Sequence, residues 1–272
     1  MKMRLLISFL ILVLLVSTSA IAETISFQED NLPTSSYQGI AIDIRSSSAN
    51  ADKNREGERG LLIGRIATAG TDDVRGLLGF DISDIPAGST ITNVMLTLSA
   101  TGGDSSSSDE NFTINLHELV GSIIEGGPGY PATNTYGPSW NSRNISGPVA
   151  WTTPGGDYDS TVLSSATDNP HTLALGDLLV FPSTTAFVSA AQDALDGSGT
   201  LYMLARATSE DVAKRGLFRL QADDPRTTDP PPSPTTYPKL TVEYTAVPEP
   251  GTLSLLLAGL IGLLAVRSHK TS

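Results

Sequence analysis

Apolar and polar residues alternate with a period of two in several short runs of the chain. In residues 38–46, Ile40, Ile42 and Ile44 fall on one face, with Asp43 and Arg45 on the other. Alternation of this kind predicts a strand with one buried face. Similar runs, separated by Gly, Pro, Ser and Asp, predict strands at 60–66, 75–83, 90–100, 111–120, 199–208, 215–221 and 238–245.

One segment has the 3.6-residue period of a helix instead. In residues 184–195, Ser183 or Thr184 can cap the start, and one apolar face is formed by Phe187, Ala190, Ala191 and Leu195. Eight strands and one short helix in a chain of this length favour an all-β fold, an antiparallel two-sheet jelly-roll-like β-sandwich. The helix is expected across an end or edge of the sheets.

The connections between strands divide into tight turns and polar excursions. Residues 85–88 read Ile-Pro-Ala-Gly, a turn sequence, so residues 74–98 are expected to form a hairpin-like unit. Residues 101–110 and 223–238 are rich in Ser, Asp, Gly and Pro. We expect both to lie outside the packed body.

Both ends of the chain carry apolar segments beside basic residues. Residues 1–22 combine Lys2 and Arg4, an apolar run and small residues at Ala20 and Ala22, which is the pattern of a signal peptide cleaved before Glu23. The second segment, residues 253–266, is short for a helix that crosses a bilayer. An N-terminal signal helix and a C-terminal hydrophobic helix are therefore expected.

The C-terminal segment follows Pro248, Glu249 and Pro250 and ends on Arg267 and Lys270. In this order the three parts of residues 247–272 resemble the PEP-CTERM sorting signal. The resemblance implies export, transient anchoring in the inner membrane of a Gram-negative bacterium, and processing by an exosortase. The alternative is an ordinary transmembrane helix that anchors the protein permanently.

The charge of the exported part limits its partners. The whole chain has 17 basic and 29 acidic residues; without the four basic and one acidic residue of the two terminal segments, 13 and 28 remain, a net charge of −15. This charge repels phosphate backbones, so nucleic acid is not expected as a partner. The chain has no cysteine, which removes thiol nucleophiles and disulfides from consideration.

Residues 23–246 form the expected globular domain, and several of its residues match a known pattern. These are Arg75, Leu77, Leu78, Phe80, Asp81, Ile85, Pro86, Gly88, Ile91 and Leu96, with Asp43 upstream and the Trp and Gly-Gly-Asp of residues 148–161 downstream. The domain resembles the DNRLRE domain, which is grouped with carbohydrate-binding modules of jelly-roll fold. Gly79 departs from the pattern, since a larger or basic residue is usual there.

Aromatic residues gather in a Gly- and Pro-rich stretch between residues 126 and 159. Tyr136, Trp140, Trp151 and Tyr158 are candidates for sugar binding, because pyranose rings stack on aromatic faces. The alternative is that these rings hold a long loop onto the sandwich.

Acidic residues and histidines are the remaining candidates. Asp157 and Asp159 project to one side of an extended segment and could bind a structural Ca²⁺. His117 is expected on a sheet surface, and no zinc or nucleophile motif accompanies it. We therefore expect a non-catalytic matrix protein, structural or glycan-contacting. The alternatives are a calcium-assisted carbohydrate-binding module and, less favoured, an enzyme with two carboxylates that cleaves polysaccharide.

Overall fold

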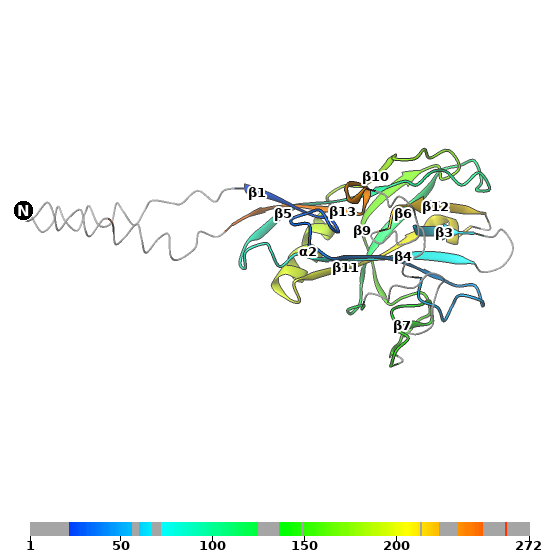
Figure 1. Cartoon of the computed structure of the whole chain (residues 1–272), viewed down its shortest axis with the longest axis horizontal. Coiled ribbons are helices and arrows are strands. Elements are labelled where there is room, and N and C mark those ends of the chain that lie inside the picture. The colour runs from blue at the N-terminus through cyan, green and yellow to red at the C-terminus, as the bar shows by residue number, and fades with distance from the viewer. Residues whose placement is uncertain are drawn as a thin grey trace, which may run out of the picture.

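The computed structural model describes residues 22–55, 60–66, 72–124, 136–147, 149–212, 214–222 and 233–246, together with Gly259. Two antiparallel sheets pack face to face in the described part of the chain (Figure 1). The predicted all-β fold with two antiparallel sheets and one helix is confirmed for these residues.

The smaller sheet has four strands in the order β1-β13-β5-β10. Their bounds are β1 (Ala22–Phe27), β13 (Lys239–Thr245), β5 (Thr90–Ser99) and β10 (Leu178–Phe181). The first and last strands of the described chain are paired from Ala22 opposite Thr245 to Phe27 opposite Leu240. The N- and C-terminal ends of the domain therefore lie side by side at one end of the smaller sheet.

The larger sheet has seven strands in the order β12-β3-β4-β11-β6-β9, with β2 beside β4. Their bounds are β12 (Gly216–Leu220), β3 (Leu61–Arg65), β4 (Asp73–Asp81), β11 (Thr200–Ala207), β6 (Phe112–Leu119), β9 (Tyr158–Asp168) and β2 (Gly39–Arg45). A third, two-stranded sheet joins β7 (Ser142–Asn144) to β8 (Val149–Ala150). Short 3-10 helices η1 (Thr208–Glu210) and η2 (Pro234–Thr236) precede β12 and β13.

The main core lies between the two large sheets. It is built from the inward positions of the strands, among them Leu78 and Phe80 of β4, Leu96 of β5, Met203 of β11 and Phe218 of β12, all with 2% of their surface or less exposed. Burying an aliphatic or aromatic side chain of this size stabilises the fold by about 1.5–3 kcal/mol. In a domain without disulfides, this core supplies the main favourable term.

The helix α2 (Thr185–Asp196) packs against strands of both large sheets, which places it across an open edge of the sandwich. Its buried residues are Phe187, Ala190 and Ala191, and the Thr184 hydroxyl accepts a hydrogen bond from the Phe187 backbone N–H at 3.1 Å. The predicted position, capping residue and apolar face are confirmed.

All eight predicted strands are present, but their connection between residues 74 and 98 differs from the expectation. β4 belongs to the seven-stranded sheet and β5 to the four-stranded sheet, so the segment crosses between sheets and is not a hairpin. The Ile-Pro-Ala-Gly turn redirects the chain, with Ile82 and Ile85 buried in the main core.

The expectation for residues 101–110 was also wrong. Asp104 and Ser107 are buried with 3% and 5% exposed, because they bind arginines and backbone of the seven-stranded sheet. Residues 223–232 of the second excursion and the two apolar terminal segments lie outside the described residues. No helix among the described residues is long and apolar enough to span a membrane.

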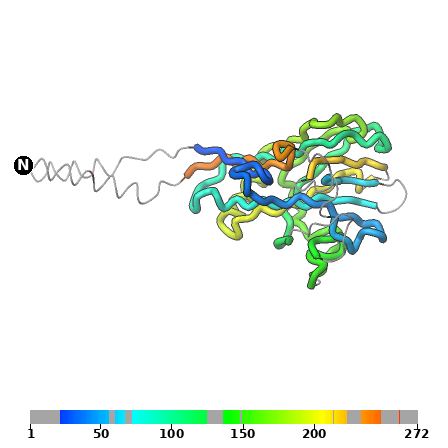
Figure 2. The backbone as a smooth tube through the Cα atoms, viewed as in Figure 1, coloured from blue at the N-terminus to red at the C-terminus, as the bar shows by residue number. Residues whose placement is uncertain are grey.

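A second, smaller apolar layer covers the outer face of the seven-stranded sheet. It contains Ile42 and Ile44 of β2, Leu77 of β4, Leu204 of β11 and Trp151, and Ile40 packs against it. The alternation in β2 is as predicted, but its isoleucines face this outer layer while Ala41 faces the main core. The chain trace in Figure 2 shows the segment with β7 and β8 lying outside the sheet on this side.

Candidate functional site

The outer face of the seven-stranded sheet carries both apolar and charged rows. In the middle row, Ile42 lies opposite Leu77, Leu77 opposite Leu204, and Leu204 opposite His117. One row further along β4, Arg75 lies opposite Ile44, and Arg206 of β11 follows Leu204 on the same face. The sheet thereby places two arginines next to an apolar surface, and this surface is buried only if another segment packs on it.

The cover comes from residues 136–158. Trp151 has 5% of its surface exposed, and its indole N–H donates to the Ser139 carbonyl at 2.8 Å. Trp140 is half-buried against the same layer. A side chain placed at Gly155 would lie 2.8 Å from the Trp140 ring and 2.7 Å from the Arg75 guanidinium, so this close approach requires a glycine.

The Arg75 guanidinium lies against two aromatic rings. Its central carbon is 4.9 Å from the Trp140 ring centroid and 5.8 Å from that of Tyr158, distances at which cation–π attraction operates. Its Nη1 donates to the Gly155 carbonyl at 2.9 Å. Arg75 therefore fastens the 136–158 segment to the sheet by stacking and by a charge-assisted hydrogen bond.

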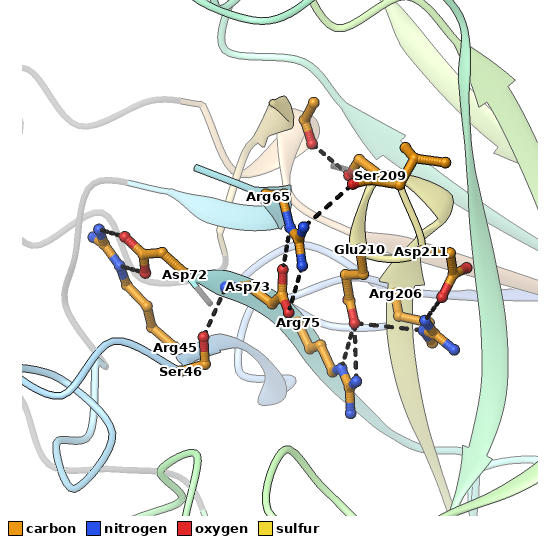
Figure 3. Close-up of polar contacts among 12 residues, drawn as sticks. Arg45, Ser46, Arg65, Asp72, Asp73, Arg75, Arg206, Ser209, Glu210 and Asp211 are labelled. Atoms are coloured by element: carbon orange, nitrogen blue, oxygen red, sulfur yellow. Dashed lines mark hydrogen bonds and ion pairs between the residues drawn. The ribbon is translucent and has the colours of Figure 1, made fainter. Parts of the chain in front are cut away.

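On its other side Arg75 binds Glu210 of η1 (Figure 3). The Arg75 Nε and Nη2 both donate to Glu210 Oε2, at 3.0 and 2.9 Å, and Arg206 Nε lies 3.5 Å from the same oxygen. Only 3% of the Glu210 side chain is exposed, and its buried Oε1 has no hydrogen-bond partner. Burial raises the pKa of Glu210, although both arginines act in the opposite direction.

Two further ion pairs extend this row of charge. Arg65 of β3 binds Asp73 at 2.8 Å, and Arg45 binds Asp72 through two nitrogen–oxygen contacts of 2.7 and 2.6 Å (Figure 3). They join the ends of β2, β3 and β4. The ion pairs of this row thus link strands that are distant in sequence.

The structure brings three of the four predicted aromatic residues together. Trp140, Trp151 and Tyr158 pack on the outer layer, whereas Tyr136 is exposed over 40% of its surface. The packing accounts for most of the surface of the two tryptophans. Of these four residues, Tyr136 and the exposed parts of Trp140 and Tyr158 are the ring surfaces that a sugar could reach.

The two predicted calcium ligands, Asp157 and Asp159, take part in local turns. The Asp157 carboxylate accepts from the backbone N–H groups of Thr152 and Thr153 at 2.8 and 2.9 Å, and Asp159 accepts from that of Thr161 at 2.7 Å. The hydrogen bonds from Thr161 lower the pKa of Asp159. No group of three His, Asp or Glu side chains suited to a metal ion occurs among the described residues. Calcium stays a prediction.

His117 is buried, not on the sheet surface as expected. Its ring has its centroid 4.8 Å from that of Tyr158, and Nδ1 lies 3.0 and 3.1 Å from the carbonyl oxygens of Asp159 and Thr161. Tyr158, Asp159 and Thr161, at the start of β9, lie against it. Burial lowers the pKa of His117, so the neutral ring is favoured.

Two open grooves lie away from the Arg75 cluster on the described part of the chain. One, of about 400 Å³, has among its lining residues Glu118, Asp193 and Tyr202. Burial, and then the charges of Asp193 and Asp159, raise the pKa of Glu118. The other, of about 370 Å³, is lined by Arg45 at the end of β2, Arg55 in the following loop, Arg215 before β12 and Arg219 of β12. Nothing in the local sequence distinguished these residues from other surface charges.

Comparison with known families identifies one feature of the chain. Residues 246–270 match the model of the PEP-CTERM protein-sorting motif. The chain is thus a β-rich protein with a sorting signal that implies export, membrane-associated sorting toward the cell surface, and processing by an exosortase. No curated protein matches the chain.

Proposed function

We propose that this protein is a non-catalytic component of the extracellular polysaccharide matrix, sorted to the surface through its C-terminal tail. The observation that supports this most is the pairing of β1 with β13, with the sorting motif directly after β13. Signal peptidase would cut at the start of β1 and exosortase beyond the end of β13. Both steps then occur at one end of the sandwich and leave its body intact.

The route begins with Sec export in a Gram-negative cell and passes through transient anchoring in the inner membrane. Residues 1–22 and 253–266 have the composition for these two steps. The paired strands β1 and β13 extend from one end of the sandwich, and β3 and β12 lie toward the other (Figure 1). A tail attached after β13 would therefore present the β3–β12 side away from the membrane.

Processing is tested in an exopolysaccharide-producing Gram-negative host with and without an exosortase. We expect the terminal peptide to be lost and the protein to reach the surface or medium only when the exosortase is present. The double variant Pro248→Ala, Pro250→Ala should stay in the membrane with its tail intact, while the neighbouring control Thr252→Ala is processed. Mass spectrometry of both termini distinguishes the outcomes, and an intact tail on wild-type protein in the exosortase-positive host contradicts the proposal.

We further propose that the sandwich is a DNRLRE-type, jelly-roll domain. Supporting this, Arg75, Phe80 and Asp81 lie on β4, Ile91 and Leu96 lie on β5, and the Gly-Gly-Asp loop meets Arg75 through Gly155. At Gly79, where the sequence departs from the family pattern, the Tyr202 ring lies 3.1 Å from the position of a Cβ. The ring fills the space that a larger residue takes elsewhere in the family.

Contact with matrix glycan is tested on protein released by the exosortase-positive host. Retention on the host polysaccharide that survives EDTA supports a structural or glycan-contacting role, and retention abolished by EDTA supports the calcium-assisted carbohydrate-binding module. Tyr136→Ala should weaken retention if the exposed ring contacts sugar, with Tyr136→Phe as its control. No retention with or without EDTA contradicts a glycan-contacting role and leaves only the structural one.

The groove with Glu118 and Asp193 favours one alternative, a polysaccharide-cleaving enzyme. A carboxyl group with a raised pKa near a second carboxylate is the arrangement that glycosidases use. Release of reducing ends by wild-type protein, abolished in Glu118→Gln, would establish this activity. Without such release, the non-catalytic role stands.

A further inference from the structure

The arginine-lined groove is set apart from the rest of this acidic protein by its charge. Its described lining residues are Arg45, Arg55, Gly60, Leu62, Ile66, Thr101, Arg215, Leu217 and Arg219. Every charged residue among them is an arginine, whereas the whole chain carries a net charge of −12. The groove thus gathers four guanidinium groups in a protein whose net charge is negative.

The arginines of the groove form ion pairs with aspartates that are not among its described lining residues. Arg55 Nε lies 2.7 Å from Asp43, whose side chain is only 1% exposed. Arg215 and Arg219 share a single carboxylate, that of Asp104, at 2.8 and 3.0 Å. Arg215 and Arg219 therefore set two guanidinium groups against one carboxylate.

The shared carboxylate is itself firmly held. Burial raises the pKa of Asp104, but the hydrogen bonds from Ser107 and Arg215 outweigh it, and the net effect is a lowered pKa. Asp104 is therefore ionised at neutral pH. It fixes Arg215, whose Nη1 also donates to the Ile66 carbonyl, so the guanidinium has little freedom left to lose on binding.

Arg219 is the residue most open to a ligand. Its side chain is 47% exposed, and Nη2 donates to Asp104 at 3.0 Å. A guanidinium has five N–H donors in a planar fork that matches carboxylate, sulfate and phosphate oxygens. The Thr101 backbone donates to the Arg219 carbonyl at 2.9 Å, so the hydroxyl-bearing Thr101 is held beside it in the same groove.

We propose that this groove binds oxyanion groups, the carboxylates or sulfates of an anionic extracellular polysaccharide. Apolar lining from Leu62 and Leu217 lowers the local dielectric, which strengthens the attraction between arginine and oxyanion. The groove lies on the β3–β12 side, which the proposed anchoring turns away from the membrane. The polymer as source rests on the proposed function, while affinity for a free oxyanion is independent of it.

Binding is tested with the processed protein purified from the exosortase-positive host. Calorimetry with inorganic sulfate tests the free ion, and affinity electrophoresis with a polyuronate, a sulfated polysaccharide and a neutral glucan tests the polymers. We expect wild-type protein to bind an anionic polymer but not the glucan, with affinity that falls as salt is added because exposed charges are screened.

Arg219→Gln should weaken binding about tenfold, the usual effect of losing one charge-assisted hydrogen bond. Thr101→Asp, which adds a negative charge to the groove, should weaken it further, and Arg219→Lys should retain part of it. Lys239→Gln on β13 removes one positive charge in the other sheet and is the matched control. Circular dichroism confirms that each variant is folded.

Each outcome bears on the proposal. Polymer binding that Arg219→Gln and Thr101→Asp weaken and Lys239→Gln leaves unchanged supports it. Binding of sulfate alone supports the site but overturns the polymer as its source. Absence of binding to all probes, or equal loss in Lys239→Gln, overturns the site, and the processing assay remains a separate test of export.

Discussion

Two arginine clusters on the seven-stranded sheet differ in what covers them. Arg75 is stacked between Trp140 and Tyr158 and bound to a carboxylate with 3% exposure. Arg219, at the edge strand, is 47% exposed and opens on a groove. The same residue type therefore fastens a loop in one place and is available to a ligand in the other. Whether other side chains cover the arginine, rather than its charge, decides between these roles.

The largest effect is expected where the arginine is covered. Arg75→Met removes both hydrogen bonds that Glu210 Oε2 accepts and leaves a buried carboxylate beside Arg206 alone. Loss of one partner of a buried ion pair costs about 3–5 kcal/mol. The free energy of unfolding, measured in urea, should fall by that amount.

The matched control for Arg75→Met is Glu210→Gln. The amide keeps an acceptor for Arg75 and carries no buried charge, so this variant should lose much less stability. Equal urea midpoints for Arg75→Met and wild type would show that the cluster does not hold the fold.

A smaller effect is expected from the tryptophan that covers the outer layer. Trp151→Phe keeps an aromatic ring but leaves the buried Ser139 carbonyl without its indole donor, a loss of about 1–3 kcal/mol. Tyr136→Phe, at an exposed ring, should stay within about 0.5 kcal/mol of wild type. Similar losses in both variants would contradict the assignment of Trp151 to packing.

His117 adds a pH dependence to the covered region. Because burial lowers its pKa below the ordinary 6.5, the unfolded chain takes up a proton first as pH falls. The stability that this neutral ring contributes is present above pH 6.5 and is lost as pH falls from there through the lowered pKa. One proton limits the slope to about 1.4 kcal/mol per pH unit.

The variant His117→Asn can still donate to the two carbonyls but has no charge to gain. Its unfolding free energy should depend less on pH than that of wild type between pH 5.5 and 7.5, as measured by urea titrations across that range. Coincident pH profiles for the two proteins would exclude His117 as the cause.

Much of the fold could be predicted from sequence because alternation is a local signal. It located eight strands and the helix, yet it passed over β1, β7, β8, β9 and β10. In β9 the Ser, Thr and Asp side chains of residues 158–168 are largely exposed, and β10 has only four residues. Alternation also cannot tell which layer a face meets, so the outer position of Ile42 and Ile44 followed only from the packing.

The site was less predictable because its partners are distant in the chain. Arg75 was recognisable as a match to the DNRLRE pattern, but Glu210 lies 135 residues away and meets it only because β11 pairs with β4. In the same way Asp104, in a segment with the composition of a free loop, reaches Arg215 across 111 residues. The spacing of these residues in the sequence does not indicate that they are in contact.

The smallest change in stability is expected in the groove. Arg219→Gln breaks a partly exposed ion pair, and pairs of this kind contribute about 0–1 kcal/mol. Asp104 keeps its contacts with Arg215 and Ser107, so no buried charge is left alone. Asp104→Asn is the contrasting variant, since it removes the carboxylate that both arginines share, and it should cost more. If urea unfolding shows Arg219→Gln to be as destabilised as Arg75→Met, Arg219 stabilises the fold in the same way as Arg75.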